Sequence, residues 1–202
     1  MTTSAQQLIE TARPTPLADP FDWERVEHRL GASVPQDYRE LLDAGGGGLW
    51  LGYVRLHVPA PGSGLKHVDL DRSGLESEQL QDLFEDEVVG PPDDLDPGSR
   101  LLPWASTGTG VTLYWQVPAE AAAGSYPIRA SDRNGDVWER YDMLTTDLLL
   151  GIVRGEVRGE LLNESWTERG VPFEPYAEEH DTLVNTLRAP AERATPDLGA
   201  RD

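Results

Sequence analysis

A run of four consecutive glycines, residues 45–48, separates two segments with different hydrophobic periods. Before the run, residues 33–43 (SVPQDYRELLD) place their apolar side chains on one stripe, which predicts an amphipathic helix starting near Pro35. After the run, residues 49–58 (LWLGYVRLHV) change to a period of two, which predicts a strand or a bent strand. The glycines are therefore expected to end the helix and to form a flexible lead into the strand.

Two further helices are predicted around this unit. Residues 20–30 follow Asp19, a residue type that caps helix N-termini, and begin with Pro20, which suits the first helical position, while Gly31 ends the pattern. Residues 75–89 carry apolar side chains at helical spacing, and acidic residues cover the rest of that surface. The apolar stripe of this helix consists of Leu80, Leu83, Phe84 and Val88.

The second half of the chain predicts a meander of four short strands over residues 100–106, 111–117, 126–131 and 137–141, the last two joined by a turn at Asn134-Gly135.

A helix over residues 145–155 closes the pattern, with Thr145 or Thr146 as its cap and Gly155 as its stop. Helices at both ends of a run of antiparallel strands indicate an α+β domain.

The sequence divides into four parts. Residues 1–18 are polar and contain two prolines, so they are expected to form a flexible or partly helical lead. Residues 19–159 hold the elements of the α+β domain. Residues 160–188 are expected to pack on that domain as an extension, and residues 189–202 to form a disordered tail.

Charge is the strongest compositional signal. Acidic residues outnumber basic ones by 36 to 17, which gives a formal net charge of −19 at pH 7. A surface this negative repels nucleic acid and anionic membranes and attracts a basic partner; the alternative explanation is solubility or adaptation to a salty environment. No apolar run reaches membrane-spanning length, and the N-terminus lacks the basic and apolar regions of an export signal, so a cytoplasmic protein is expected.

The patterns of common catalytic and cofactor sites do not occur in this chain. It contains no cysteine, which excludes thiolate metal sites and cysteine nucleophiles. The glycines at 45–48 lack the lysine and hydroxyl residue of a phosphate loop. Ser106 lacks the first glycine of a nucleophile elbow. We therefore expect neither an enzyme nor a cofactor.

Two short acidic stretches resemble metal-binding sequences in part. Residues 132–136 (DRNGD) match three positions of a calcium loop, but Val137 and Met143 stand where glycine and glutamate are required, so a hairpin turn explains them better. Residues 67–71 (HVDLD) place a histidine and two aspartates on one side of an extended segment. No second histidine is near in sequence, so a solvated loop is favoured and no metal is expected.

Three stretches together resemble the SUKH superfamily, which includes yeast cell-wall regulators and many bacterial immunity proteins. They are FDWERVEHRLGASVPQDYRELLDAGGGG, LLPWASTGTGVTLYW and YPIRASDRNGDVWERYDMLTTDLLLGIVRG, and the resemblance covers residues 21–155. Many members carry Gly-Asp after the hairpin turn, whereas this chain has Gly110-Val111, so a role of that aspartate does not transfer. The matching residues are of the kind that define a fold: Trp23, Pro35, Tyr38, Gly110 and Trp138.

The resemblance implies an α+β domain whose helices pack on a curved, mostly antiparallel sheet, without shared catalytic residues. It also implies a protein partner. Bacterial members act as immunity proteins that neutralise toxins, often nucleases, whose phosphate-binding clefts are basic. The alternative that the resemblance offers is a regulatory or scaffold module of the cell-wall-regulator type, which binds a cellular protein. Its oligomeric state is left open.

One acidic stretch is the candidate contact surface for such a partner. Between Arg72 and Arg100 the chain holds nine acidic residues, Glu76 among them, and no basic residue. The alternative is a solvated helix face followed by a linker, since runs of charge are usually that. The eight residues proposed for partner binding are Glu78, Asp82, Glu85, Asp86, Glu87, Asp93, Asp94 and Asp96.

Overall fold

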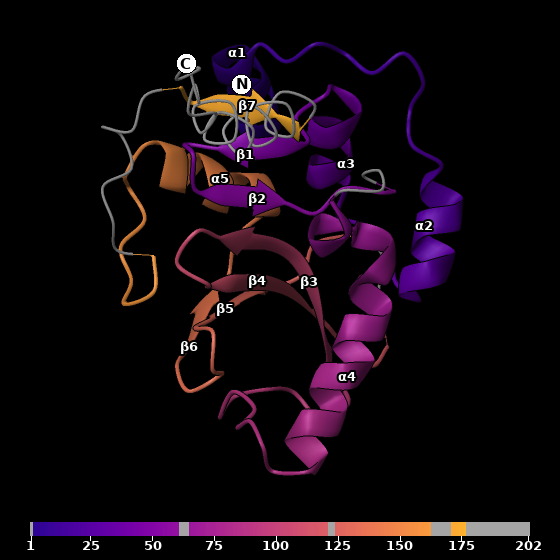
Figure 1. Cartoon of the computed structure of the whole chain (residues 1–202), viewed down its shortest axis with the longest axis vertical. Coiled ribbons are helices and arrows are strands. Elements are labelled where there is room, and N and C mark those ends of the chain that lie inside the picture. The colour runs from indigo at the N-terminus through magenta and orange to yellow at the C-terminus, as the bar shows by residue number, and fades with distance from the viewer. Residues whose placement is uncertain (1, 61–64, 121–123, 163–170, 177–202) are drawn as a thin grey trace, which may run out of the picture.

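The computed structural model describes residues 2–60, 65–120, 124–162 and 171–176. In this part of the chain, five helices pack against one curved, seven-stranded antiparallel sheet with the order β6-β5-β4-β3-β2-β1-β7, which confirms the predicted α+β class (Figure 1). The helices are α1 (Ser4–Ala12), α2 (Trp23–Leu30), α3 (Gln36–Asp43), α4 (Ser73–Glu85) and α5 (Thr145–Val153). The strands are β1 (Gly48–Trp50), β2 (Val54–Leu56), β3 (Arg100–Thr107), β4 (Thr112–Val117), β5 (Ile128–Ser131), β6 (Trp138–Tyr141) and β7 (Phe173–Pro175).

One face of the sheet carries an aromatic core. Trp104 of β3 and Trp115 of β4 stack with their ring planes 14° apart, and Tyr38 of α3 meets both rings edge-on. All three side chains are fully buried. The indole of Trp115 donates a hydrogen bond of 2.9 Å to the hydroxyl of Thr145 in α5. Because α1 packs on both α3 and α5, these three helices cover this face together.

The other face of the sheet is polar and is partly covered by α4. Side chains alternate between the two faces along a strand, so Tyr114 and Gln116 of β4 point away from the tryptophan core. At the start of α4, the hydroxyl of Ser73 donates to the carbonyl oxygen of Pro103 in β3 over 2.6 Å. This contact fixes α4 against β3 on the second face (Figure 1).

The apolar stripe predicted for residues 75–89 is only partly buried. Leu80 and Phe84 are half-buried, but Leu83 and Val88 are 39% and 67% exposed. The C-terminal half of α4 runs towards the lower end of the molecule, away from β1 and β2 (Figure 1). The buried positions of α4 are instead small and lie in its first turns, where the helix approaches the sheet and α2 closely: Ser73, Gly74 and Ser77.

The start of α2 differs from the prediction. The helix begins at Trp23, and the side chain of Asp22 accepts a hydrogen bond of 3.1 Å from the backbone N–H of Arg25. Asp22 is therefore the N-cap, and the predicted start at residues 19–20 is wrong, because an acidic residue closer to the apolar stripe takes this role. Gly31 ends the helix in the left-handed conformation, as predicted.

The start of α5 also differs, because its cap comes from another helix. No side chain of the segment itself caps α5. Asp37 of α3 accepts hydrogen bonds from the backbone N–H of Thr146 over 2.7 Å and from its hydroxyl over 2.9 Å. The predicted cap by Thr145 or Thr146 is therefore wrong, and a carboxylate 109 residues away takes its place at the positive end of the helix.

The N-terminal segment is a packed helix. Thr3 and Gln6 form a reciprocal capping box at the start of α1, and Leu8 is fully buried against the core. Of the two forms expected for residues 1–18, flexible or partly helical, the structure shows the partly helical one, with a helix over Ser4–Ala12.

Part of the C-terminal extension belongs to the sheet. β7 pairs with β1, and the ring of Phe173 lies 4.8 Å from the ring of Trp50, centroid to centroid. The predicted tail, residues 189–202, lies outside the described residues, as do residues 163–170 and 177–188.

Residues 49–58, which the alternating pattern predicts to be one strand, form the β1–β2 hairpin. Leu51 and Gly52 have φ values of 54° and 64°, and the backbone N–H of Tyr53 donates to the carbonyl oxygen of Trp50 over 2.9 Å. Positive φ at both central residues is the mark of the turn that joins twisted strands tightly. Gly52 suits this conformation but a leucine rarely adopts it, so the sequence gives only part of the signal for this turn.

The glycine run is closely packed. Gly45 has a φ of 90°, and a Cβ at this position would lie 2.2 Å from the carbonyl oxygen of Thr15. A Cβ on Gly48 would lie 2.3 Å from the carbonyl oxygen of Glu174. Both neighbours are backbone atoms, which cannot turn aside as a side chain can. The run therefore ends α3 and leads into β1, as expected, and it lets two distant segments approach the junction closely.

We predict that Gly48→Ala destabilises the protein, because the new methyl group overlaps the backbone of β7. Overpacking of this kind costs about 1–3 kcal/mol. Gly90→Ala is the matched control, since nothing lies within 4 Å of a Cβ built there and its φ is not positive. Urea unfolding of both variants measures the difference. An equal free energy of unfolding for the two variants would show that β7 yields at this point.

Candidate functional site

The eight acidic residues proposed for partner binding are all exposed, and they fall on two elements. Glu78, Asp82 and Glu85 lie on α4. The other five lie on residues 86–99, a segment that follows α4 and is called here the acidic loop: Asp86, Glu87, Asp93, Asp94 and Asp96.

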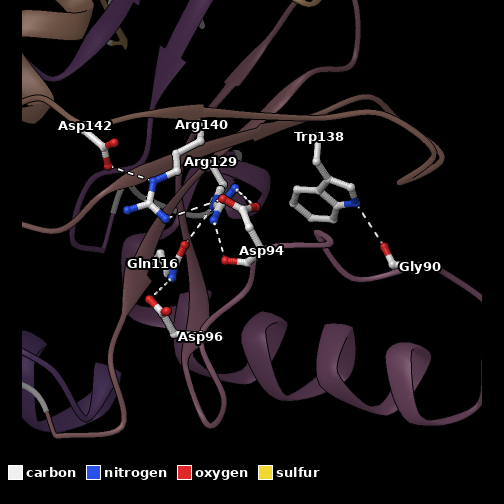
Figure 2. A network of polar contacts seen from close by, with 8 residues as sticks. All are labelled: Gly90, Asp94, Asp96, Gln116, Arg129, Trp138, Arg140 and Asp142. Carbon is white, nitrogen blue, oxygen red and sulfur yellow. Dashed lines mark hydrogen bonds and ion pairs between the residues drawn. The ribbon is translucent and has the colours of Figure 1, made fainter.

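The acidic loop is tied to the polar face of the sheet by a network of side chains (Figure 2). Asp94 accepts a hydrogen bond of 2.6 Å from Arg129 of β5, and its second carboxylate oxygen lies 3.5 Å from a guanidinium nitrogen of Arg140 in β6. Gln116 of β4 donates to Asp96 over 2.8 Å and accepts from Arg129 over 2.7 Å. Three strands therefore hold two of the eight candidate acids.

Trp138 of β6 holds the start of the same loop. Its indole N–H donates to the carbonyl oxygen of Gly90 over 3.0 Å (Figure 2). The same N–H lies 3.0 Å from the carbonyl oxygen of Gly135 and donates to it as well. The ring also meets Phe84 of α4 edge-on, with the centroids 6.1 Å apart. Trp138 thus connects the start of the acidic loop to α4 and to β6, the strand at one edge of the sheet.

Asp94 is the counter-ion of the buried guanidinium of Arg129. The side chain of Arg129 is only 2% exposed, whereas that of Asp94 is 61% exposed. A buried guanidinium is costly unless its donors are paired, and here Asp94 supplies both a carboxylate and its backbone carbonyl. The hydrogen bond from Arg129 also lowers the pKa of Asp94. Asp94 therefore serves as an internal counter-ion.

We predict that Asp94→Ala lowers the thermal unfolding midpoint, because it leaves the buried guanidinium of Arg129 without its charged partner. Asp93→Ala is the control: it removes the same charge from the neighbouring residue, which is exposed and forms no ion pair within the described residues. Circular dichroism during heating measures both midpoints. Equal midpoints would mean that Arg129 finds another partner when Asp94 is lost.

The carboxylates that remain free gather on the outward side of α4, which is called here the outer face. Helical geometry places Leu75, Glu78, Asp82, Leu83 and Asp86 on one side of the helix, and all five are exposed. The two leucines are 50% and 39% exposed. The three acids take part in no ion pair within the described residues. The outer face thus offers free negative charge around two apolar side chains.

Family models, curated proteins and solved structures were compared with the chain, and none matches it.

The aspartates of the two stretches that resemble metal sites, residues 132–136 and 67–71, form hydrogen bonds and ion pairs within the fold. Asp132 accepts hydrogen bonds from the backbone N–H groups of Asp136 and Val137 over 2.8 and 3.0 Å, so residues 132–136 form the predicted hairpin turn. Asp71 pairs with Arg25 and Arg29 of α2 over 2.7 and 3.0 Å. Among the described residues, no three histidine or acidic side chains gather as metal ligands. In the same part of the chain, no helix has the length and apolar character needed to cross a membrane.

A polar cavity between α4 and the sheet was not predicted from the sequence. It has a volume of about 200 Å³ and includes His57, which is only 4% exposed. Burial lowers the pKa of His57 to about 4; a hydrogen bond to the backbone of Pro103 acts against this shift, and nearby His67 adds to it. The alternation in residues 49–58 places His57 on a polar face, so the sequence gives no sign that the ring is buried.

We predict that His57 makes the protein less stable as the pH falls. The folded state keeps the ring neutral down to about pH 4, whereas the unfolded chain binds a proton near pH 6.5. The unfolded state therefore binds more protons between these values, and the free energy of unfolding falls by about 2 kcal/mol between pH 6.5 and pH 5. His57→Gln should weaken this slope in urea unfolding experiments. A ring that titrates near pH 6.5 by NMR would contradict the prediction.

Proposed function

We propose that this protein is a non-catalytic binding protein of the SUKH type, an immunity protein that neutralises a basic toxin domain. The observation that carries the proposal is the outer face of α4, where Glu78, Asp82 and Asp86 are exposed and take part in no ion pair within the described residues. The resemblance of residues 21–155 to SUKH proteins supports the same conclusion.

The physical basis of the proposal is electrostatic complementarity. A nuclease or another enzyme that acts on phosphates has a basic cleft, and an acidic surface occupies such a cleft in place of the phosphates. The net charge of −19 draws a basic partner towards the protein at long range, and the free carboxylates of the outer face guide the final approach. Leu75 and Leu83 add apolar surface between them, which suits the centre of an interface.

The structure narrows the candidate surface relative to the eight residues named from the sequence. Asp94 is paired with the cation of Arg129, and Asp96 accepts a hydrogen bond from Gln116, so both carboxylates already have partners within the molecule. Glu85 accepts a long hydrogen bond of 3.3 Å from Gln81 on the same helix. The proposal therefore rests on the outer face, extended by the exposed carboxylates of Glu87 and Asp93.

We predict that neutralising the outer face slows association with the basic domain encoded by the adjacent gene. Glu78→Gln, Asp82→Asn and Asp86→Asn together should reduce the association rate constant about tenfold at low salt and flatten its dependence on salt. The control removes three charges elsewhere, through Glu10→Gln, Asp19→Asn and Glu24→Gln, all at exposed positions. Stopped-flow or biosensor kinetics at several salt concentrations measure both triple variants.

Two outcomes would count against the proposal. Equal association rate constants for the two triple variants would exclude the outer face as the contact surface for the partner. Failure of the protein to rescue growth when it is co-expressed with the adjacent gene product, together with the absence of a complex in size-exclusion chromatography, would remove the immunity function. Recovery of a housekeeping protein from the native host would then favour the regulatory or scaffold alternative.

A further inference from the structure

The cavity between α4 and the polar face of the sheet is separate from the outer face. Glu76 and Leu80 of α4 form one wall, on the side of the helix that faces the sheet. Strands β3 and β4 and the segments that hold His57 and His67 form the rest. The full lining is His57, His67, Glu76, Leu80, Pro103, Ser106, Thr112 and Tyr114.

Most of the lining can accept hydrogen bonds, and Glu76 is its only carboxylate among the residues that the structure describes. Burial raises the pKa of Glu76, with a further rise from Asp69, while Arg72 acts in the opposite direction. The Arg72 pair is loose, because the guanidinium and carboxylate atoms are 3.9 Å apart and both side chains are partly exposed. Glu76 thus faces the cavity as a partly desolvated anion that is weakly compensated, a state that a cation in the cavity would relieve.

Three hydroxyl groups and a neutral imidazole complete the polar lining. Burial raises the pKa of Tyr114, so its hydroxyl stays protonated, and Ser106 and Thr112 stand beside it on the paired strands β3 and β4. The Nδ1 atom of His57 is buried and has no hydrogen-bond partner among the described residues. Because Nδ1 is closed to solvent, the ring meets the cavity through its other atoms and contributes a neutral group to the lining.

The charge of the cavity decides the class of ligand. Apart from the two histidines, no basic residue is among the described residues that line it, so an anion would meet the carboxylate of Glu76, which Arg72 compensates only weakly, in a protein of net charge −19. A metal ion is not favoured either: His57, His67 and Glu76 all line the cavity, but within the described residues they do not come together as a group of three metal ligands. A cationic N–H donor fits the carboxylate and the hydroxyl oxygens of the lining together.

We propose that this cavity binds a cationic nitrogen group, an ammonium or guanidinium, carried by a small organic molecule or by a protein side chain. The proposal does not depend on the immunity function, because the cavity and the outer face use different sides of α4 and no residue in common.

Binding is tested with methylguanidinium and methylammonium as probes, and with acetate at equal ionic strength as the anionic control. The ring nitrogen resonances of His57 and His67, followed by NMR, are expected to shift and to saturate with the cations only. Glu76→Gln should weaken binding about tenfold, the typical effect of losing one charge-assisted hydrogen bond. Glu78→Gln is the matched control, with the same change of charge on the outward side of the same helix.

The two sources of the cation are separated with N-acetylarginine N-methylamide, which carries the guanidinium on a peptide backbone. Saturable binding of this compound supports a protein side chain as the natural occupant, and binding of the free cations alone supports a small molecule. Three results would overturn the proposal: shifts that rise linearly without saturation, equal shifts with acetate, or equal affinities for Glu76→Gln and Glu78→Gln. The thermal midpoints of both variants verify that the fold is intact.

Discussion

The hydroxyl of Tyr38 joins the helical layer to the centre of the sheet. It lies 2.7 Å from the carbonyl oxygen of His57 and 3.0 Å from that of Trp104, and it donates to this pair. Trp104 is the extra residue where the β3–β4 register shifts, and its carbonyl also accepts from the backbone N–H of His57. Burial raises the pKa of Tyr38 well above its usual value, so the hydroxyl remains a donor. One buried hydroxyl thus supplies a donor to the His57 carbonyl and a second donor to the Trp104 carbonyl, where the backbone of the sheet is irregular.

This interaction also determines what each face of the sheet can do. The backbone of His57 is held from the side of α3, and its ring lines the cavity under α4. The first face is filled by the apolar and aromatic side chains of the core. The second face carries polar side chains, such as Arg129 and Gln116, which need hydrogen-bond partners. Asp94 of the acidic loop is the partner of Arg129. The cavity around Glu76 lies on the same face, and no residue of the acidic loop lines it. Structure and candidate function are therefore divided between the two faces.

The sequence predicts local features well and distant pairings poorly. Gly31 and the Asn134-Gly135 turn carry their own conformational signal, and the structure confirms both. The β1–β2 turn was missed because Leu51 adopts a left-handed conformation that its type rarely takes. The pairing of Asp94 with Arg129 was missed because the two residues are 35 apart in sequence and no local pattern links them; only the fold brings them together. The acidic surface was therefore found from composition, but not the division of its acids between internal and external roles.

The acids at the end of α4 do not stabilise the helix. The last turn of α4 contains no basic residue, and Asp82, Glu85 and Asp86 lie at its C-terminal end, where the helix dipole is negative. Like charges at this end repel the dipole and one another, so each works against the helix that carries it. Local conflicts of this kind concentrate at functional sites, since a purely structural helix would exchange them for lysine or arginine. A cationic surface docked at this end would remove the repulsion, and that relief favours binding over the solvated-helix explanation.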